Sequence, residues 1–219
     1  MPFTPSHTIR LAACAAAFHL LAATSGAAQR LTVAGMFSST THDQLNQPIG
    51  AMLSLITGGA GSRVNILVSI SRQQRTSDGT GQVCGGLIDP NNCPVESFEE
   101  MGRLSLLGFG ADVHLVGSSA VALSFQPQFL WGRARTETEG ATTGNRLFAE
   151  KGQLGFSGGL ELRAFPFRDF PVGVALGGAY SRLGPSSGDE PQDAYTPFDH
   201  WYSVWTAYLG ATLGWGRRR

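Results

Sequence analysis

Large apolar residues alternate with small or polar residues along much of this chain. The segment SAVALSFQPQFLWGRAR, residues 119–135, shows the pattern clearly. Its large apolar residues are Val121, Leu123, Phe125, Phe129 and Trp131, and most of the residues between them are Ala, Ser, Gln or Gly. Because side chains of a β-strand point alternately to opposite faces, the segment predicts a strand with one apolar and one polar face.

Eight segments of this kind can be placed along the chain. They cover residues 31–39, 49–57, 64–75, 103–116, 120–135, 153–165, 172–183 and 201–215. The connections after the second, fourth and sixth segments are short, whereas those after the first, third, fifth and seventh are long and polar. An even strand count with short turns at one end and long loops at the other predicts an all-β fold, an eight-stranded antiparallel up-and-down transmembrane β-barrel.

The placement of acidic residues tests which face points inward. Most fall in the predicted long loops, namely Asp43, Asp78, Glu96, Glu99, Glu100, Glu137, Glu139, Asp189, Glu190, Asp193 and Asp199. Within the predicted strands only Asp112 and Glu161 are acidic, and both share the face of small polar residues. Such a face suits a narrow barrel lumen, so we expect the apolar face to meet lipid. The alternative is a soluble lipocalin-like binder with the opposite facing.

Two further features bear on the barrel. Pro127 shares the apolar face but cannot donate a hydrogen bond, so we expect a β-bulge at this point. Aromatic residues near both ends of the strands predict two interfacial girdles. These residues are Trp131, Tyr180, Trp201 and Trp205 toward the long loops, and Phe165, Phe167, Phe170 and Trp215 toward the short turns.

The 219-residue chain has one periodic region, which predicts one domain. A charged start, a short apolar run and small residues before Gln29 predict a cleaved signal peptide, residues 1–28, ahead of a barrel over 29–216 and a basic tail, 217–219. Loss of Arg10 with this leader changes the formal net charge from zero to minus one. In an exported chain, Cys84 and Cys93, separated by a short Gly- and Asn-rich stretch, predict a disulfide rather than a metal site.

The last strand has a recognisable ending. The segment YLGATLGW, with Tyr208, Gly210, Leu213 and Trp215, resembles the C-terminal signal that hands outer-membrane barrels to their assembly machinery. With eight predicted strands, the chain from about residue 29 to 215 resembles small outer-membrane proteins of the OmpA/OmpX type. The resemblance implies a bacterial outer-membrane location and contact with the assembly machinery. The residues after Trp215 depart from the pattern, because the aromatic residue usually ends the chain.

Two groups of charged residues are candidate sites. Asp112, His114, Glu161 and Arg163 have lumenal parity near the short turns, and they form either a structural polar plug or a proton or ion path. Arg72, Arg103, Arg133 and Arg182 have outward parity near the long loops. There they contact lipopolysaccharide phosphates or simply extend their charges to the membrane surface.

The sequence favours a non-catalytic function. No spacing resembles a metal site, a phosphate loop or a nucleic-acid interface, and a lipid-modifying enzyme would need a His and a Ser placed differently. We expect a monomer without cofactor, embedded in outer-membrane lipid and lipopolysaccharide, that stabilises the envelope or presents its loops to an external partner. The alternative is a narrow channel for small solutes, which needs a continuous lumenal water path.

Overall fold

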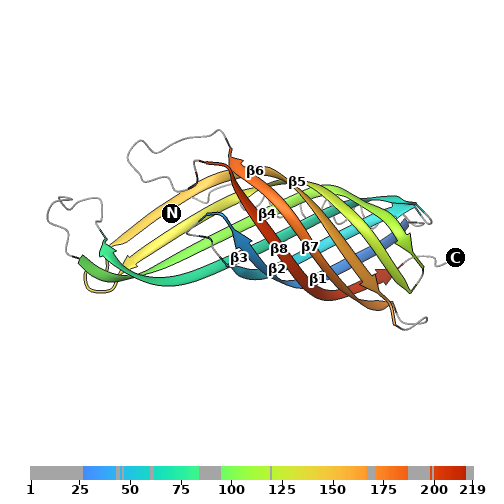
Figure 1. The fold of residues 1–219 in the computed structure, drawn as a ribbon, viewed down its shortest axis with the longest axis horizontal. Coiled ribbons are helices and arrows are strands. Elements are labelled where there is room, and N and C mark those ends of the chain that lie inside the picture. Colours follow the sequence, from blue (N-terminus) through green and yellow to red (C-terminus); the bar gives the residue numbers. More distant parts are fainter. Residues whose placement is uncertain are drawn as a thin grey trace, which may run out of the picture.

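Eight antiparallel strands close into a barrel in the computed structural model, which describes residues 27–42, 45, 47–59, 62–83, 95–118, 120–166, 171–186, 198 and 200–215. The strands are β1 (Ala27–Thr40), β2 (Ile49–Gly59), β3 (Val64–Gln82), β4 (Val95–Gly117), β5 (Val121–Gly140), β6 (Arg146–Ala164), β7 (Val172–Pro185) and β8 (Tyr202–Trp215). Each pairs with the next, and β8 pairs with β1 (Figure 1). The predicted fold class is confirmed.

Several of the sequence-based assignments fall wholly or partly outside this described part, among them the loop residues Asp43, Asp189, Glu190, Asp193 and Asp199. The predicted signal peptide is described only at Ala27 and Ala28, with which β1 begins, and the tail 217–219 is not described. Cys84, Cys93 and the girdle residues Phe167 and Phe170 also lie outside the described residues. Among the residues that are described, no helix is long and apolar enough to cross a membrane.

The strands are strongly staggered around the ring. Following the paired residues once around the barrel from Arg30 leads back to Thr40, ten residues further along β1. The path runs through lumen-facing residues such as Ile56 and Leu67, which are fully buried. An eight-stranded barrel with tilted strands has an interior just wide enough for its own side chains. The lumen is therefore a packed core.

The apolar faces of the strands point outward, as predicted. In β5, Ser124 and Gln126 are buried, while Phe129 and Trp131 are 57% and 58% exposed. The same outward belt includes Val33, Phe37, Leu53, Ile66, Ile70, Phe109, Phe156, Leu160, Leu176 and Leu209. A soluble monomer does not leave so continuous an apolar surface in water. This facing contradicts the lipocalin-like alternative.

Four strands are longer than the other four. β3, β4, β5 and β6 have 19, 23, 20 and 19 residues, whereas β1, β2, β7 and β8 have 14, 11, 14 and 14. The excess projects as one sheet beyond the rest of the barrel, at the end of the long connections (Figure 1). We call this part, residues 75–82, 95–102, 136–140 and 146–152, the projecting sheet.

The projecting sheet corrects the prediction of long acidic loops. Six of the acidic residues assigned to loops lie in its strands: Asp78, Glu96, Glu99, Glu100, Glu137 and Glu139. The predicted loop 136–152 is reduced to a turn over residues 141–145. Beyond the lipid both faces of a sheet meet water, so the apolar alternation that reveals a strand is lost while the backbone pairing continues.

The bulge predicted at Pro127 is wrong in position. Pro127 lies directly opposite Gly158 of β6, and the register between β4 and β5 is the same on both sides of it. The register shifts instead at Leu115, between His114 and Val116. Because proline has no backbone N–H, Pro127 removes one hydrogen bond from the strand ladder. The loss of one bond does not require the extra residue that makes a β-bulge.

One end of the lumen is apolar, which the sequence pattern does not predict. Buried residues at the end with long connections form one cluster, which we call the cap: Leu45, Leu104, Leu106, Leu130, Ala134, Leu183, Phe198, Tyr202 and Val204. Leu45 comes from the β1–β2 connection and Phe198 from the β7–β8 connection, and both are fully buried. One described residue from each of these two connections thus packs among the side chains at the barrel mouth.

Gly210 is required where β8 meets β1. A Cβ atom on Gly210 would overlap the carbonyl oxygen of Val33 and lie 2.6 Å from the Cα of Ala34. We expect Gly210→Val to destabilise the barrel by about 1–3 kcal/mol and to lower the yield of folded protein, seen as the heat-shifted band on gels. Gly35→Val is the matched control, because Gly35 lies on the same seam with nothing within 4 Å of its Cβ position. Equal yields for the two variants would contradict the prediction.

Candidate functional site

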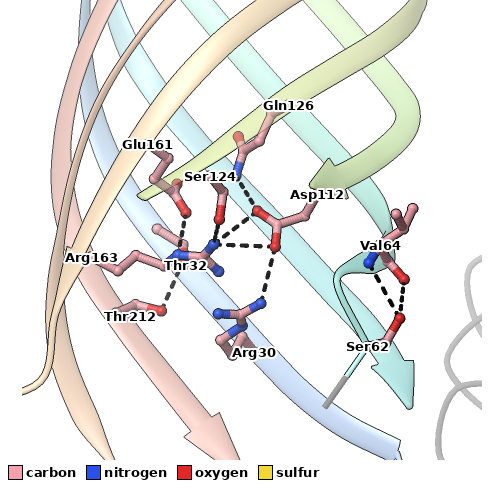
Figure 2. A network of polar contacts seen from close by, with 10 residues as sticks. All are labelled: Arg30, Thr32, Ser62, Val64, Asp112, Ser124, Gln126, Glu161, Arg163 and Thr212. Carbon is pink, nitrogen blue, oxygen red and sulfur yellow. Dashed lines mark hydrogen bonds and ion pairs between the residues drawn. The ribbon is translucent and has the colours of Figure 1, made fainter. Parts of the chain in front are cut away.

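Buried charges gather in the lumen near the short turns. The guanidinium of Arg163 on β6 lies 2.9 Å from Oδ1 of Asp112 on β4 through Nη2, and 3.2 Å from Oε1 of Glu161 through Nε. All three side chains are fully buried (Figure 2). A buried charge is tolerated only when it is paired and hydrogen-bonded, so these groups depend on one another.

A second cation completes this lumenal cluster. Nη2 of Arg30 on β1 lies 3.0 Å from Oδ2 of Asp112, so each oxygen of that carboxylate meets a guanidinium. Gln126 donates a hydrogen bond to Oδ1 of Asp112, and Arg163 donates one to the hydroxyl of Ser124 (Figure 2). With both arginines and both carboxylates ionised, the formal charges cancel.

The sequence pattern does not single out Arg30, because the predicted strand begins at residue 31. The alternation along β1 could have identified Arg30, because Arg30 is on the same face of the strand as Thr32 and Ala34, which both point inward and are buried.

Tyr208 joins the lumenal cluster from β8. Its hydroxyl donates a hydrogen bond to Oε2 of Glu161 at 3.0 Å. The sequence placed Tyr208 only in the assembly signal, but in the folded barrel this residue is buried and holds a lumenal carboxylate. The cluster therefore connects β1, β4, β5, β6 and β8 across the lumen and acts as a cross-brace.

His114 is not part of the lumenal cluster. It lies two residues beyond Asp112 on β4, next to the bulge, and is only half-buried. Its backbone N–H donates to the carbonyl oxygen of Arg63, and its ring makes no hydrogen bond or ion pair with the described residues. The structure thus brings together three of the four lumenal residues that the sequence singled out, and adds Arg30 and Tyr208.

A small cavity lies between the lumenal cluster and the cap. Its volume is about 50 Å³, and polar residues such as Gln73, Gln126 and Ser157 line it together with apolar residues such as Met36 and Leu106. Such a space has room for a few water molecules. Among the described residues, the cap lies on one side of this space and the ion-paired cluster on the other, so buried side chains occupy the lumen at both ends of the cavity.

The outward arginines lie near the base of the projecting sheet. Arg72, Arg133 and Arg182 are exposed, and Arg103 is half-buried with Nη2 directed at the sulfur of Met101. Arg133 lies 2.6 Å from Glu150. The sequence missed Arg135, which has the same outward parity, pairs with Glu137 at 3.2 Å and places its guanidinium 4.4 Å from the centre of the Phe148 ring.

One carboxylate organises the turn at the tip of the projecting sheet. Glu96 on β4 accepts hydrogen bonds from the backbone N–H groups of Thr142 and Thr143 and from the Thr143 hydroxyl. The hydroxyl and backbone donors of Thr143 lower the pKa of Glu96 below its usual 4.5, because they stabilise the ionised form. The β5–β6 turn is thereby fastened to β4.

This fastening predicts an acid-sensitive turn. A carboxyl group whose pKa is lowered by folding stabilises the fold above its unfolded value near 4.5, and the contribution is lost as the pH falls through the folded value. We expect amide exchange at Thr142 and Thr143 to become several-fold faster in Glu96→Gln at neutral pH, because a neutral amide oxygen is a weaker hydrogen-bond acceptor for these N–H groups than the ionised carboxylate. Hydrogen exchange measures this. Glu99→Gln, at an exposed position on the same strand, should leave both amides unchanged.

The fold is similar to that of solved outer-membrane proteins. The attachment invasion locus protein Ail of Yersinia pestis, in complex with the heparin analogue sucrose octasulfate, is 12% identical, with a TM-score of 0.53 over 87% of this chain and 99% of that chain. A major outer membrane protein from Thermus thermophilus is 14% identical, with a TM-score of 0.54 over 86% of this chain and 99% of that chain. No family model and no curated protein sequence matches the chain. The likeness establishes the fold, that of small outer-membrane β-barrels.

Proposed function

We propose that this protein is a non-catalytic outer-membrane β-barrel of a bacterial envelope, which acts by presenting its projecting sheet to external partners. In this proposal residues 1–28 are removed during export. The ending with Tyr208, Gly210, Leu213 and Trp215 is recognised by the barrel assembly machinery. Cys84 and Cys93 close the β3–β4 connection with a disulfide.

The observation that carries the proposal is the unequal length of the strands. Four strands continue past the apolar belt as a paired sheet with charged residues on its surface, among them Glu99, Glu139 and Arg146. A barrel that only needed to span lipid would have no use for this sheet. The lumen is packed with side chains at both ends of a small cavity. Of the residues that the structure describes, those of the projecting sheet therefore offer the surface to a partner.

The outward arginines support a contact with lipopolysaccharide. Guanidinium groups suit bidentate contacts with phosphate, and Arg72, Arg103, Arg133 and Arg182 lie where an outer leaflet would place its phosphates. We expect added lipopolysaccharide to raise the melting temperature of the detergent-solubilised protein. The increase in melting temperature should be smaller in a variant with all four arginines changed to Gln. An equal increase would show that these arginines do not contact lipopolysaccharide.

The structure does not favour the alternative of a narrow channel. A conducting barrel needs a continuous hydrated lumen, whereas here, among the described residues, the side chains of the cap and of the lumenal cluster occupy the lumen on either side of a cavity of about 50 Å³. In planar bilayers we expect no single-channel steps from the purified protein. Regular steps would show that the lumen opens and would replace the proposal.

The first experiment is cell fractionation of the expressed full-length chain. We expect the protein in the outer-membrane fraction, with a band whose mobility changes on boiling. Protease treatment of intact cells should then cut only in the long connections and the projecting sheet. Recovery as a soluble periplasmic protein would overturn the proposed location. Cleavage at the β4–β5 turn in intact cells would overturn the proposed orientation.

A further inference from the structure

Among the described residues, one edge of the projecting sheet has no further strand paired with it. Strand β6 pairs with β7 only from Gln153 onward, where Gln153 faces Pro185, but it pairs with β5 up to Arg146, which faces Glu139. In residues 146–150 the backbone therefore has a strand partner on one side only, among the described residues. Leu147 and Phe148, on opposite faces of this edge, are 40% and 53% exposed. An edge of this kind is a template for a further strand.

The opposite edge of the projecting sheet differs in composition. There β3 continues beyond Gln74, the last residue that pairs with β2, over the sequence RTSDGTGQ. Two glycines and the absence of large apolar residues make this segment a poor template, since cross-strand side-chain pairs stabilise a sheet. Of the two edges, β6 is the one suited to adding a strand.

The charges along the β6 edge are self-complementary. Arg146, Phe148 and Glu150 share the outward face, and Phe148 is midway between the two charges. In an antiparallel pairing of this segment with its own copy, centred on Phe148, Arg146 faces Glu150 of the second copy. The two Phe148 rings then face each other, and the charge pair occurs twice.

The charge pattern of the neighbouring strand extends this complementarity. Arg146 is paired with Glu139 on β5 at 3.0 Å, and Glu150 lies opposite Arg135 on β5 in the register. In the joined sheets the row across the junction reads Glu139, Arg146, Glu150 of the second copy and Arg135 of the second copy. The signs alternate along the whole row, so pairing places no like charges opposite each other.

We propose that residues 146–150 pair antiparallel with the same residues of a second copy in a facing membrane, so that the protein joins two membrane surfaces. The direction of the strand selects a facing copy. In one membrane all copies of β6 run in the same sense between the two surfaces, whereas a copy in an opposed membrane runs in the reverse sense. Each contact is short, but many copies on each surface act together.

The inference rests on the proposed function, because the projecting sheet must stand outside the membrane. The test uses phosphatidylcholine vesicles containing the purified full-length protein, with clustering followed by light scattering. Wild-type vesicles should cluster. Arg146→Glu and Glu150→Arg should each reduce the clustering rate at least about tenfold, since each creates two like-charge pairs at the junction.

Mixing vesicles of the two variants gives the decisive result. In the mixed pair every acidic residue meets a basic one, so clustering should return to the wild-type level. Arg63→Glu, the same charge change at the exposed end near the short turns, should cluster like the wild type. Dispersed wild-type vesicles that contain folded, heat-shifted protein would overturn the inference alone. Clustering of Arg146→Glu at the wild-type rate, or no rescue on mixing, would also overturn it. Failure to enter vesicles at all would instead overturn the proposed function.

Discussion

Replacing Arg163 with methionine is expected to lower the free energy of unfolding by about 3–5 kcal/mol, because the change leaves Asp112 and Glu161 as buried charges that have lost their main partner. Urea unfolding in detergent micelles, followed by tryptophan fluorescence, measures the loss. Adding Asp112→Asn to this variant should recover part of it, since one unpaired charge is then removed.

The matched control for Arg163 is an arginine at the surface. Arg133 forms an ion pair of 2.6 Å with Glu150, but its side chain is 62% exposed. Exposed pairs contribute about 0–1 kcal/mol, so Arg133→Met should change the unfolding free energy little. Similar losses for the two variants would show that the lumenal cluster does not brace the barrel.

Replacing Leu209 with arginine should have the second-largest effect. Leu209 on β8 points outward and is 61% exposed, within the apolar belt. A charged side chain near the middle of a bilayer destabilises a membrane barrel by about 2–4 kcal/mol. In phospholipid vesicles we expect this loss of unfolding free energy together with slower insertion.

Val95→Arg provides the comparison for Leu209. Val95 is 68% exposed, but it lies at the start of β4 in the projecting sheet, beyond the belt. A surface substitution in water changes stability by no more than about 0.5 kcal/mol. If both arginine variants lost the same unfolding free energy, Leu209 and Val95 would lie in the same environment, either lipid or water. The assigned membrane boundary would then be wrong.

The strands and their facing could be predicted because one rule determines both. A membrane barrel needs an apolar residue at every second position, and Phe129 and Trp131 display that period where the strand crosses lipid. The same rule explains the failures. Glu99 and Glu139 lie in regular strands that do not touch lipid, so the pattern that marks a strand ends before the strand does.

The lumenal cluster could be predicted only in part. The alternation along a strand tells which residues face the lumen, but it does not tell how far along the barrel axis they lie or which side chains they contact. Asp112, Glu161 and Arg163 were placed in the lumen by parity, and so was His114, which stays outside the cluster. Arg30 reaches Asp112 across 82 residues of sequence because the stagger of the closed ring brings the start of β1 level with the end of β4. That relation depends on the register of every strand between them.

The cap has a consequence for the order of folding. Leu45 and Phe198 belong to connections that follow β1 and precede β8, the two strands whose pairing closes the ring. These side chains can pack together in the mouth only after the first and last strands have met. A probe at either position should therefore report the final step of folding, later than probes on the strands between them.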